Sequence, residues 1–418
     1  MILYCARHLL PIDSPGIEDG ALLVDGRRVI AVGLRRDLAA AHPGIQIVDF
    51  GDAVILPPLV NAHTHLELTD FPDWSAAVGE GGDGDFADWI LNLVRVRRTV
   101  GVDAARLSLQ NGLRQSLSAG TGAIGDILTT LDLTEAYRGS PLAGRVFVEV
   151  LGIDPSAVAT RLAAISGHLS APPTPSLGWG LSPHAPYTLN RDTFAQALKF
   201  ADERRLPLAT HWAETAGERG FLSGGPGILQ RLYTTVGWPL PPDPPAVGQS
   251  SGLVVHGVHL RSDEIDALAR AGSTVILCPR SNSAFGDARA PVAALRQAGV
   301  PLAIGTDSRA SCPSLSVWDE LAFARTWFSG TLDPDEWLAI ATSGGSKALG
   351  MEGRMGRLAI GHPADFQVVA LPPEATSANL SEALCSAGSG IELRALCLAG
   401  ENVLPLPSAL PIMTPPVS

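Results

Sequence analysis

The chain has 418 residues, of which 46% are hydrophobic and 17% are charged. This length exceeds one small domain, and the apolar content supports a large buried core rather than disorder. The formal net charge of −12 argues against a nucleic-acid partner, because binding a phosphate backbone needs a basic surface.

Membrane and export signals are not evident in the sequence. The first residues lack a basic region followed by a long apolar stretch, and no apolar run approaches the roughly 18 residues of a membrane span. The five cysteines are odd in number, scattered and without a close CxxC spacing. We therefore expect a cytoplasmic protein with no disulfide framework and no membrane partner.

Both ends of the chain have the pattern of short strands. Apolar runs at 21–24 and 28–32 flank the turn Asp25-Gly26, which is a specific hairpin signal. Near the other end, an apolar run at 366–370 follows a glycine-rich segment. We expect residues 1–57 and 357–404 to form one small composite β domain, a β-sandwich, and the proline-rich residues 405–418 to form an irregular tail.

Between these ends, apolar strand-like runs alternate with helical patterns, which is typical of a parallel α/β fold. One helix is predicted behind the cap Asp85 and another at 193–200, while 239–252 is typical of a long surface loop. The strands number eight, so residues 58–356 are predicted to form a (β/α)8 barrel. The predicted strands are 54–56 running up to His63, 122–126, 145–150, 177–181, 207–211, 253–256, 274–278 and 301–307.

Histidines gather at the ends of these strands, where (β/α)8 enzymes build their active sites. His63 and His65 are two residues apart, so on an extended strand both face the barrel axis. His211 ends the fifth predicted strand and Asp307 the eighth. Three imidazoles and a carboxylate suit zinc or another first-row divalent ion, with one position open for water.

Polar residues beside these ligands are candidates for catalysis. Glu214 follows His211 by three residues, so it is either a proton shuttle above the bound water or a helix-start residue at the surface. His256 ends the sixth strand and is the candidate for orienting the water or the leaving group, with His259 as a structural partner. His184, beyond the fourth strand, makes either a substrate contact or a local structural bond.

Five short motifs follow one another along the predicted barrel. They are Asn61-Ala62-His63-Thr64-His65, His211-Trp212-Ala213-Glu214, Val255-His256-Gly257-Val258-His259, Cys278-Pro279-Arg280-Ser281-Asn282 and Gly305-Thr306-Asp307-Ser308. Together these motifs resemble the cytosine-deaminase/chlorohydrolase branch of the amidohydrolase superfamily, and 361–366 resembles part of its split accessory domain.

The resemblance implies one metal, usually zinc or iron, with Glu214 as acid/base, His256 directed at the substrate and Asp307 sharing in proton transfer. It also implies His63, His65, His211 and Asp307 as ligands, and a possible homodimer.

Some relatives in that superfamily hold two metals bridged by a carboxylated lysine at the fourth strand. Lys199 and Lys347 are the only lysines here, and both fall in predicted helices. This excludes a lysine-bridged pair of metals and favours deamination over opening of cyclic amides.

The extended motif 63–68, with 86–90 downstream, is similar to aminodeoxyfutalosine deaminases, which act on an adenine-nucleoside-like substrate. In that interpretation Glu67 is a substrate contact; otherwise it forms a salt bridge at the rim. The glycine-rich segment 69–85 is predicted to be part of a lid. Trp74, Phe86 and Trp89 are candidates for stacking on the ring or for the core, and His184, Arg280, Ser308 and Arg309 for polar contacts.

The expected reaction is hydrolytic deamination of an amino-substituted heterocycle, with an adenine-nucleoside-like small molecule such as aminodeoxyfutalosine as the substrate. One alternative is a chlorohydrolase, or another hydrolase of C–N bonds, acting on a related ring. A non-catalytic scaffold is the other alternative, but it would be expected to lack some of the metal ligands, which are all present here.

Overall fold

The computed structural model describes residues 1–79, 84–225, 227, 229–239 and 243–404, whose strands form three sheets. The predicted tail 405–418 lies outside the described residues. None of the described helices is both long and apolar enough to cross a membrane.

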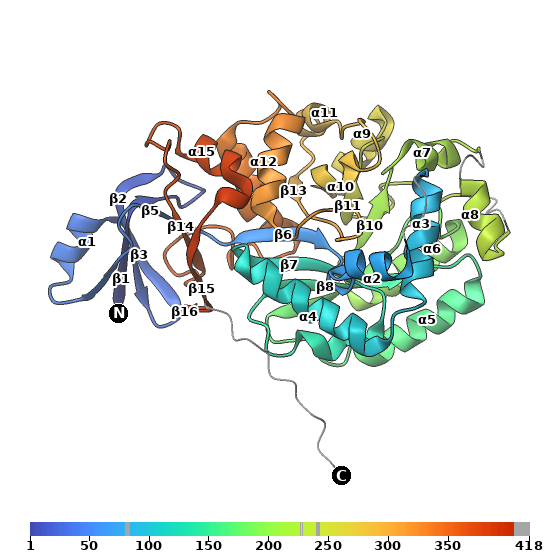
Figure 1. Cartoon of the computed structure of the whole chain (residues 1–418), viewed down its shortest axis with the longest axis horizontal. Helices are drawn as coiled ribbons and strands as arrows, with labels where there is room; N and C mark the ends of the chain where they lie inside the picture. The colour runs from blue at the N-terminus through green and yellow to red at the C-terminus, as the bar shows by residue number, and fades with distance from the viewer. Residues whose placement is uncertain (80–83, 226, 228, 240–242, 405–418) are drawn as a thin grey trace, which may run out of the picture.

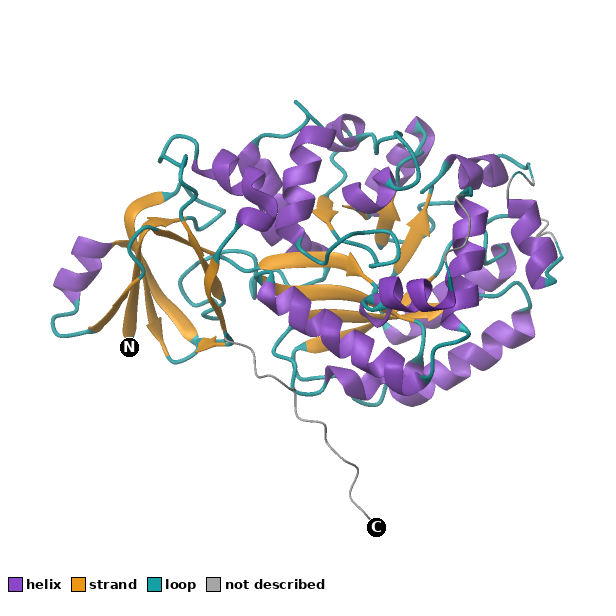
Figure 2. Cartoon of the chain, in the orientation of Figure 1, coloured by secondary structure: helices purple, strands orange, loops and turns teal. Residues whose placement is uncertain are grey.

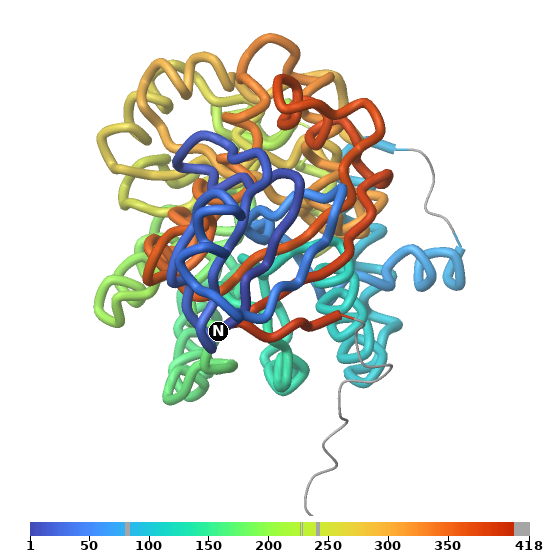
Figure 3. Tube along the Cα trace, turned by 90° about the vertical axis from the view of Figure 1, so that its left-hand side faces the viewer, coloured from blue at the N-terminus to red at the C-terminus, as the bar shows by residue number. Residues whose placement is uncertain are grey.

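Strands from both ends of the chain share one eight-stranded sheet, and Figure 3 shows the early and late segments side by side. Its order is β16-β15-β14-β5-β1-β2-β3, with β4 paired to β1. The predicted hairpin at Asp25-Gly26 is confirmed, because β2 and β3 pair antiparallel and Gly26 has a φ of 54°. The β-sandwich stays a prediction. The strands are β1 (Ile2–Leu9), β2 (Ile17–Asp25), β3 (Arg28–Leu34), β4 (Gln46–Asp49), β5 (Ala53–Leu56), β14 (Phe366–Ala370), β15 (Leu393–Leu398) and β16 (Glu401–Asn402).

The first predicted barrel strand was wrong, because it combined two strands. β5 ends at Leu56 and belongs to the terminal sheet, whereas β6 (Leu59–Thr64) begins the parallel part of the fold. Pro57 and Pro58 separate them, since proline has no N–H to give to a ladder. The buried Gln367 of β14 fixes this junction by donating from Nε2 to the Pro57 carbonyl at 2.9 Å.

The middle of the chain forms two four-stranded parallel sheets, ordered β6-β7-β8-β9 and β10-β11-β12-β13. Isolated parallel bridges join Thr64 to Asp307 and Leu181 to Leu208, which links both outer strands of one sheet to those of the other. The remaining predicted strands are confirmed, although the last is shorter than expected. They are β7 (Thr121–Leu128), β8 (Ala143–Val150), β9 (Leu177–Pro183), β10 (Ala209–Trp212), β11 (Leu253–His256), β12 (Thr274–Leu277) and β13 (Leu302–Ile304).

Helices surround these parallel strands, as Figure 2 shows. The predicted cap of α3 is confirmed, because the Asp85 side chain accepts from the amides of Ala87 and Asp88 at 3.0 and 3.2 Å. The helices are α1 (Arg35–Ala41), α2 (Phe71–Val78), α3 (Phe86–Arg97), α4 (Val102–Ser118), α5 (Pro155–His168), α6 (Arg191–Arg204), α7 (Ala216–Leu222), α8 (Leu229–Val236), α9 (Ser262–Ala271), α10 (Pro279–Ser283), α11 (Val292–Gln297), α12 (Val317–Trp327), α13 (Pro334–Ala339), α14 (Gly345–Ala348) and α15 (Leu380–Ala387).

Two predicted loops fall partly outside the described residues. The segment 69–85 contains the helix α2, while 80–83 are not described, so the lid stays a prediction. In 239–252 the described residues contain no helix or strand, and 240–242 are not described. Figure 1 places α2 and α3 beside the ends of the parallel strands, where the candidate site lies.

Candidate metal centre and active site

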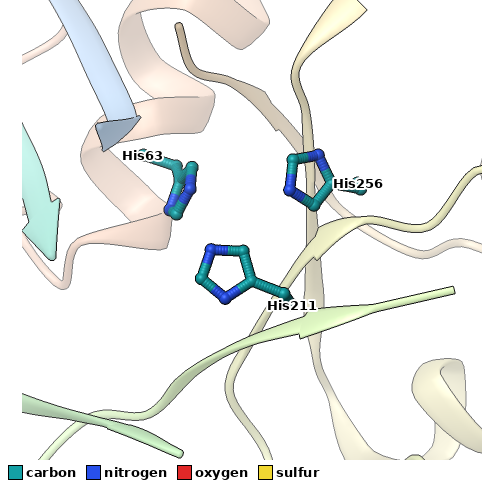
Figure 4. Close-up of side chains that lie close together, drawn as sticks. All are labelled: His63, His211 and His256. Carbon is teal, nitrogen blue, oxygen red and sulfur yellow. The ribbon is translucent and has the colours of Figure 1, made fainter. Parts of the chain in front are cut away.

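The histidines predicted to bind metal converge at the carboxyl ends of the parallel strands. The ring centre of His211 lies 4.9 Å from that of His63 and 5.4 Å from that of His65. Figure 4 shows His63, His211 and His256 directed toward a common point. Asp307 completes the cluster, because its Oδ1 lies 3.4 Å from the Nε2 atoms of both His63 and His65.

The donor atoms of this cluster fit a divalent cation. The Nε2 atoms of His65 and His211 face each other at 3.3 Å, and the buried Nε2 of His63 has no hydrogen-bond partner among the described residues. Burial lowers the pKa of His65 to about 4 and that of His211 well below its usual value, so both rings are neutral and offer lone pairs. Among the described residues, three compact groups could hold a metal: His63, His211 and His256; His63, His65 and Asp307; and Glu214, His256 and Asp307.

Neighbouring groups orient the ligand atoms. The Nδ1 atom of His211 lies 2.9 Å from the His184 carbonyl, so it donates there and leaves Nε2 free to bind. On the opposite side, the Asp307 Oδ2 accepts from the hydroxyls of Ser281 at 2.6 Å and Ser311 at 3.0 Å. The other oxygen, Oδ1, therefore faces His63 and His65 and is available to bind a metal. Sequence reasoning missed both serines, although Ser281 lies inside one of the motifs.

Glu214 and His256 form a pair beside the cluster. The Glu214 Oε1 lies 3.5 Å from the His256 Nε2, and the amide of Asn282 donates to the His256 Nδ1 at 3.0 Å. Because Nδ1 accepts, the proton of the neutral ring is on Nε2, facing Glu214. Burial lowers the pKa of His256 to about 3, whereas burial and then the nearby Asp307 raise the pKa of Glu214 well above its usual value.

The backbone around these groups is strained. Ala213, His256 and Asp307 have φ angles of 53°, 72° and 58°, in the left-handed region that residues with a Cβ rarely adopt. Ala213 directly follows β10, His256 ends β11, and Asp307 lies three residues beyond the end of β13. Such conformations persist only where surrounding contacts hold them, and they gather at functional sites.

A cavity of about 570 Å³ opens beside the cluster, within the size range of small-molecule sites. Its lining combines a polar end, which includes Glu214, His256 and Asp307, with apolar walls from α3 and α8 and with Arg97 and Arg98. The apolar wall residues are Leu68, Trp89, Ile90, Leu93, Val94, Leu151, Leu232, Val236 and Trp238.

Three of the predicted substrate residues line this cavity: His184, Trp89 and Ser308. The His184 Nδ1 is 2.8 Å from the Thr188 hydroxyl, while its Nε2 is 3.8 Å from the Glu149 carboxylate. Sequence reasoning missed Glu149, which also lines the cavity. Burial alone would raise its pKa, but the groups around it, with His184 the strongest, together outweigh that effect and lower it.

The structure places the other predicted contacts away from the cavity lining. Arg280 donates from Nε to the buried Glu320 at 2.7 Å, and Glu67 is paired with Arg97. Arg280 and Glu67 each form an ion pair with a residue of opposite charge. For Glu67, this agrees with the alternative that it forms a salt bridge at the rim. Of the other predicted aromatics and cations, Phe86 stacks on Trp89 in a core cluster, whereas Trp74 and Arg309 lie outside the lining.

The remaining histidines do not join the cluster. His259 donates its backbone amide to the Ala213 carbonyl at 2.8 Å, as expected of a structural partner. His8 lies in β1 of the terminal sheet, and His168 ends α5.

Comparison with known proteins agrees with this geometry. Residues 54–388 match the profile of the Amidohydrolase family. A 5-methylthioadenosine/S-adenosylhomocysteine deaminase of Nitratidesulfovibrio vulgaris is 32% identical over 92% of this chain and 87% of its own length. An aminodeoxyfutalosine deaminase of Deinococcus radiodurans is 32% identical over 79% of this chain and 81% of its own length.

Solved structures support the same fold. The Helicobacter pylori aminofutalosine deaminase in complex with methylthio-coformycin has a TM-score of 0.84 at 22% identity, covering 97% of this chain and 100% of its own. A zinc-bound adenosine deaminase from Xanthomonas campestris has a TM-score of 0.74 at 25% identity, covering 96% and 92%. The predicted family and reaction type are thereby confirmed: this chain belongs to the amidohydrolase family and is a hydrolase that acts on carbon–nitrogen bonds.

Proposed function

We propose that this chain removes the amino group from the adenine base of a nucleoside by hydrolysis. The observation that carries the proposal is the position of Glu214, which lines the cavity and lies beside the cluster of proposed metal-binding groups. The deaminase names of the relatives support the same chemistry.

The strands β6 to β13 would close into a (β/α)8 barrel, as predicted, and the bridges Thr64–Asp307 and Leu181–Leu208 support this closure. His63, His65, His211 and Asp307 would hold one zinc ion, a metal that the ligand types favour and that a related deaminase contains. Such an ion lowers the pKa of a water molecule and polarises it for attack.

The residues around the cluster would divide the proton transfers among them. Asp307 and Glu214 accept a proton as the water oxygen bonds to the carbon that carries the amino group, and Glu214 passes a proton to the adjacent ring nitrogen. The bond to the amino nitrogen then breaks, and the second proton of the water, which Asp307 has accepted, passes to that nitrogen so that it leaves as ammonia. His256, with its proton on Nε2, donates to the attacking oxygen and keeps it oriented.

The cavity favours a nucleoside with an apolar group on its sugar. Trp89 offers an aromatic face, while Leu232, Val236 and Trp238 extend the apolar wall. His184 and Glu149 are placed to accept or donate hydrogen bonds to the base or the sugar hydroxyls. 5-Methylthioadenosine, S-adenosylhomocysteine and aminodeoxyfutalosine, which appear in the names of the relatives, are thus the first substrates to test.

The test is ammonia release by the zinc-loaded protein with these three nucleosides, adenosine, guanine, cytosine and a chloro-triazine. We expect turnover of at least one adenine nucleoside and none of guanine or cytosine. Chloride release from the triazine without ammonia release from any nucleoside would instead support the chlorohydrolase alternative. Zinc bound at one per chain with no turnover of any compound would contradict the substrate class.

A further inference from the structure

Glu214 follows an unusual turn. After β10, Ala213 takes a φ of 53°, which an L-residue adopts only when other contacts hold it there. The carbonyls of this turn are fixed from one side, because Trp212 and Ala213 accept from the amides of Gly257 at 3.0 Å and His259 at 2.8 Å. The amides of the turn need partners of their own, since the segment is buried.

One carboxylate satisfies both amides. The Glu218 Oε1 accepts from the Ala213 amide and its Oε2 accepts from the Glu214 amide, each at 2.8 Å. Glu218 lies in the first turn of α7 and has no solvent exposure. Two successive amides that point at one anion form a fixed pocket for negative charge, so the two oxygens determine the direction of the peptide between them.

Packing alone does not account for a carboxylate at this position. Burial is the largest influence on Glu218 and raises its pKa to about 7, and within the described part of the chain it makes no ion pair. A carboxylate that forms no direct ion pair is costly to bury even with the charge of Arg219 nearby, whereas an apolar side chain would not carry this cost. The Ala213 and Glu214 amides explain the carboxylate, because it accepts a hydrogen bond from each of them and an apolar side chain could accept neither.

We propose that Glu218 is a positioning residue for the deamination: it holds the left-handed turn at Ala213 and thereby places the Glu214 carboxylate beside His256. This role rests on the proposed function of Glu214. The metal ligand upstream has its own support, because both the backbone amide and Nδ1 of His211 contact the His184 carbonyl at 2.9 Å. Loss of Glu218 therefore moves Glu214 and leaves the metal cluster in place.

The test compares Glu218→Gln with the parent enzyme. The amide keeps the size of the side chain, but its NH2 group faces one of the two backbone amides as a second donor. We expect kcat to fall on the order of 10- to 100-fold, the effect of a small misplacement of a catalytic group, with KM within about threefold. Zinc should stay at one per chain. A rise in KM with unchanged kcat, or no fall in kcat, overturns the proposal.

Glu264→Gln is the matched control. Glu264 is also a buried carboxylate at the start of a helix, and it accepts from the Arg261 amide at 2.9 Å without contacting the turn. Its substitution should leave kcat within about twofold, as for residues outside the catalytic unit. If Glu218→Gln does not fold, Glu218→Asp keeps the charge but shortens the reach, and it should lower kcat in the same direction.

Two further measurements separate positioning from general damage. In a Glu214→Asp background, Glu218→Gln should lower kcat much less than in the parent, because residues that act as a unit are not additive. Equal losses in both backgrounds overturn the proposal. A crystal structure of Glu218→Gln should show the Glu214–His256 contact lengthened beyond 3.5 Å. This readout needs no substrate, so it can fail or succeed independently of the deaminase assignment; an unchanged turn overturns the role of Glu218.

Discussion

The two parallel sheets contribute to the site in different ways. Strands β6 to β9 have 6, 8, 8 and 7 residues, whereas β10 to β13 have 4, 4, 4 and 3. The longer strands present His63 by regular alternation, with its side chain inside the fold. Three of the shorter strands have a left-handed residue at or within three residues of their carboxyl end: Ala213 after β10, His256 in β11 and Asp307 after β13.

This difference separates two methods of placing a functional group. Regular strand geometry needs no help beyond the ladder, while each strained turn of the second sheet depends on a side chain that holds it or its neighbour. Glu218 binds the turn at Ala213, Asn282 binds His256, and Ser281 binds Asp307. We therefore expect activity to depend more on the residues that support the second sheet, which lie in α7 and α10, than on those that support the first.

The largest effect is expected for Glu214→Gln, which removes the proposed proton shuttle beside the second sheet. We expect kcat to fall on the order of 1,000-fold, because the amide cannot accept and return a proton. Zinc should remain at one per chain, measured by metal analysis, because Glu214 is not among the four proposed ligands. As a control, the exposed Glu203→Gln should retain full kcat. Retained turnover in Glu214→Gln would assign the shuttle to another residue.

Ser281→Ala tests whether support for a ligand matters as much as support for the shuttle. The Ser281 hydroxyl donates to the Asp307 Oδ2 at 2.6 Å. Its loss should weaken zinc binding roughly 10- to 100-fold, as is usual when a group behind a metal ligand is removed. Competition with a fluorescent chelator measures this affinity. Ser283→Ala, in the same helix, should bind zinc like the parent, and equal affinities in all three proteins would contradict the prediction.

Asp126→Asn tests a support in the first sheet. The buried Asp126 accepts from the Leu66 amide at 2.8 Å and from the Tyr137 hydroxyl, and burial raises its pKa to about 8. The unfolded chain has an Asp126 pKa of about 4. Between that pH and pH 8 the folded state binds more protons than the unfolded state, so the free energy of unfolding falls as pH rises.

Replacement by asparagine removes this titration. The parent should lose more than about 1 kcal/mol relative to Asp126→Asn between pH 5 and pH 8, measured by urea unfolding. Parallel pH profiles for the two proteins would show that Asp126 is ionised in the folded state throughout this range.

The smallest effect isolates the strain itself. Ala213→Gly and Ala209→Gly each remove one buried methyl group from the same short segment, but Ala209 lies in the extended part of β10. Glycine carries no penalty for a positive φ, so Ala213→Gly should be less destabilising than Ala209→Gly by ~1 kcal/mol. Thermal unfolding of both variants measures the difference, and equal losses would mean that the turn stores no strain.

Much of the site could be predicted from the sequence because ligands at strand ends follow from alternation and spacing. His63 and His65 needed only a strand, and His211, His256 and Asp307 ended runs that were visibly apolar. The first strand should have been divided at Pro57-Pro58, where the missing N–H groups interrupt a ladder. Glu149 is the penultimate residue of the predicted strand 145–150, so its position near the strand end was a signal that could have been used.

Other features depend on contacts between residues far apart in sequence. Arg280 resembled a substrate contact until Glu320, 40 residues later, was found to pair with it. The roles of Glu218 and Ser281 arise from backbone angles and hydroxyl directions that no sequence spacing encodes. Partners of this kind are selected by three-dimensional proximity, so a motif can identify the ligands and still omit what supports them.

The junction at Pro57 has a consequence for how the protein is made. The residue that donates to its carbonyl, Gln367, lies 310 residues later in the chain. During translation, β5 therefore waits for most of the polypeptide to emerge before β14 can pair with it and fix the entry to β6. A nascent chain that has already exposed all of its proposed metal ligands still lacks this anchor. We therefore expect the proposed metal site to become fully ordered only after residue 367 has left the ribosome, late in the synthesis of each molecule.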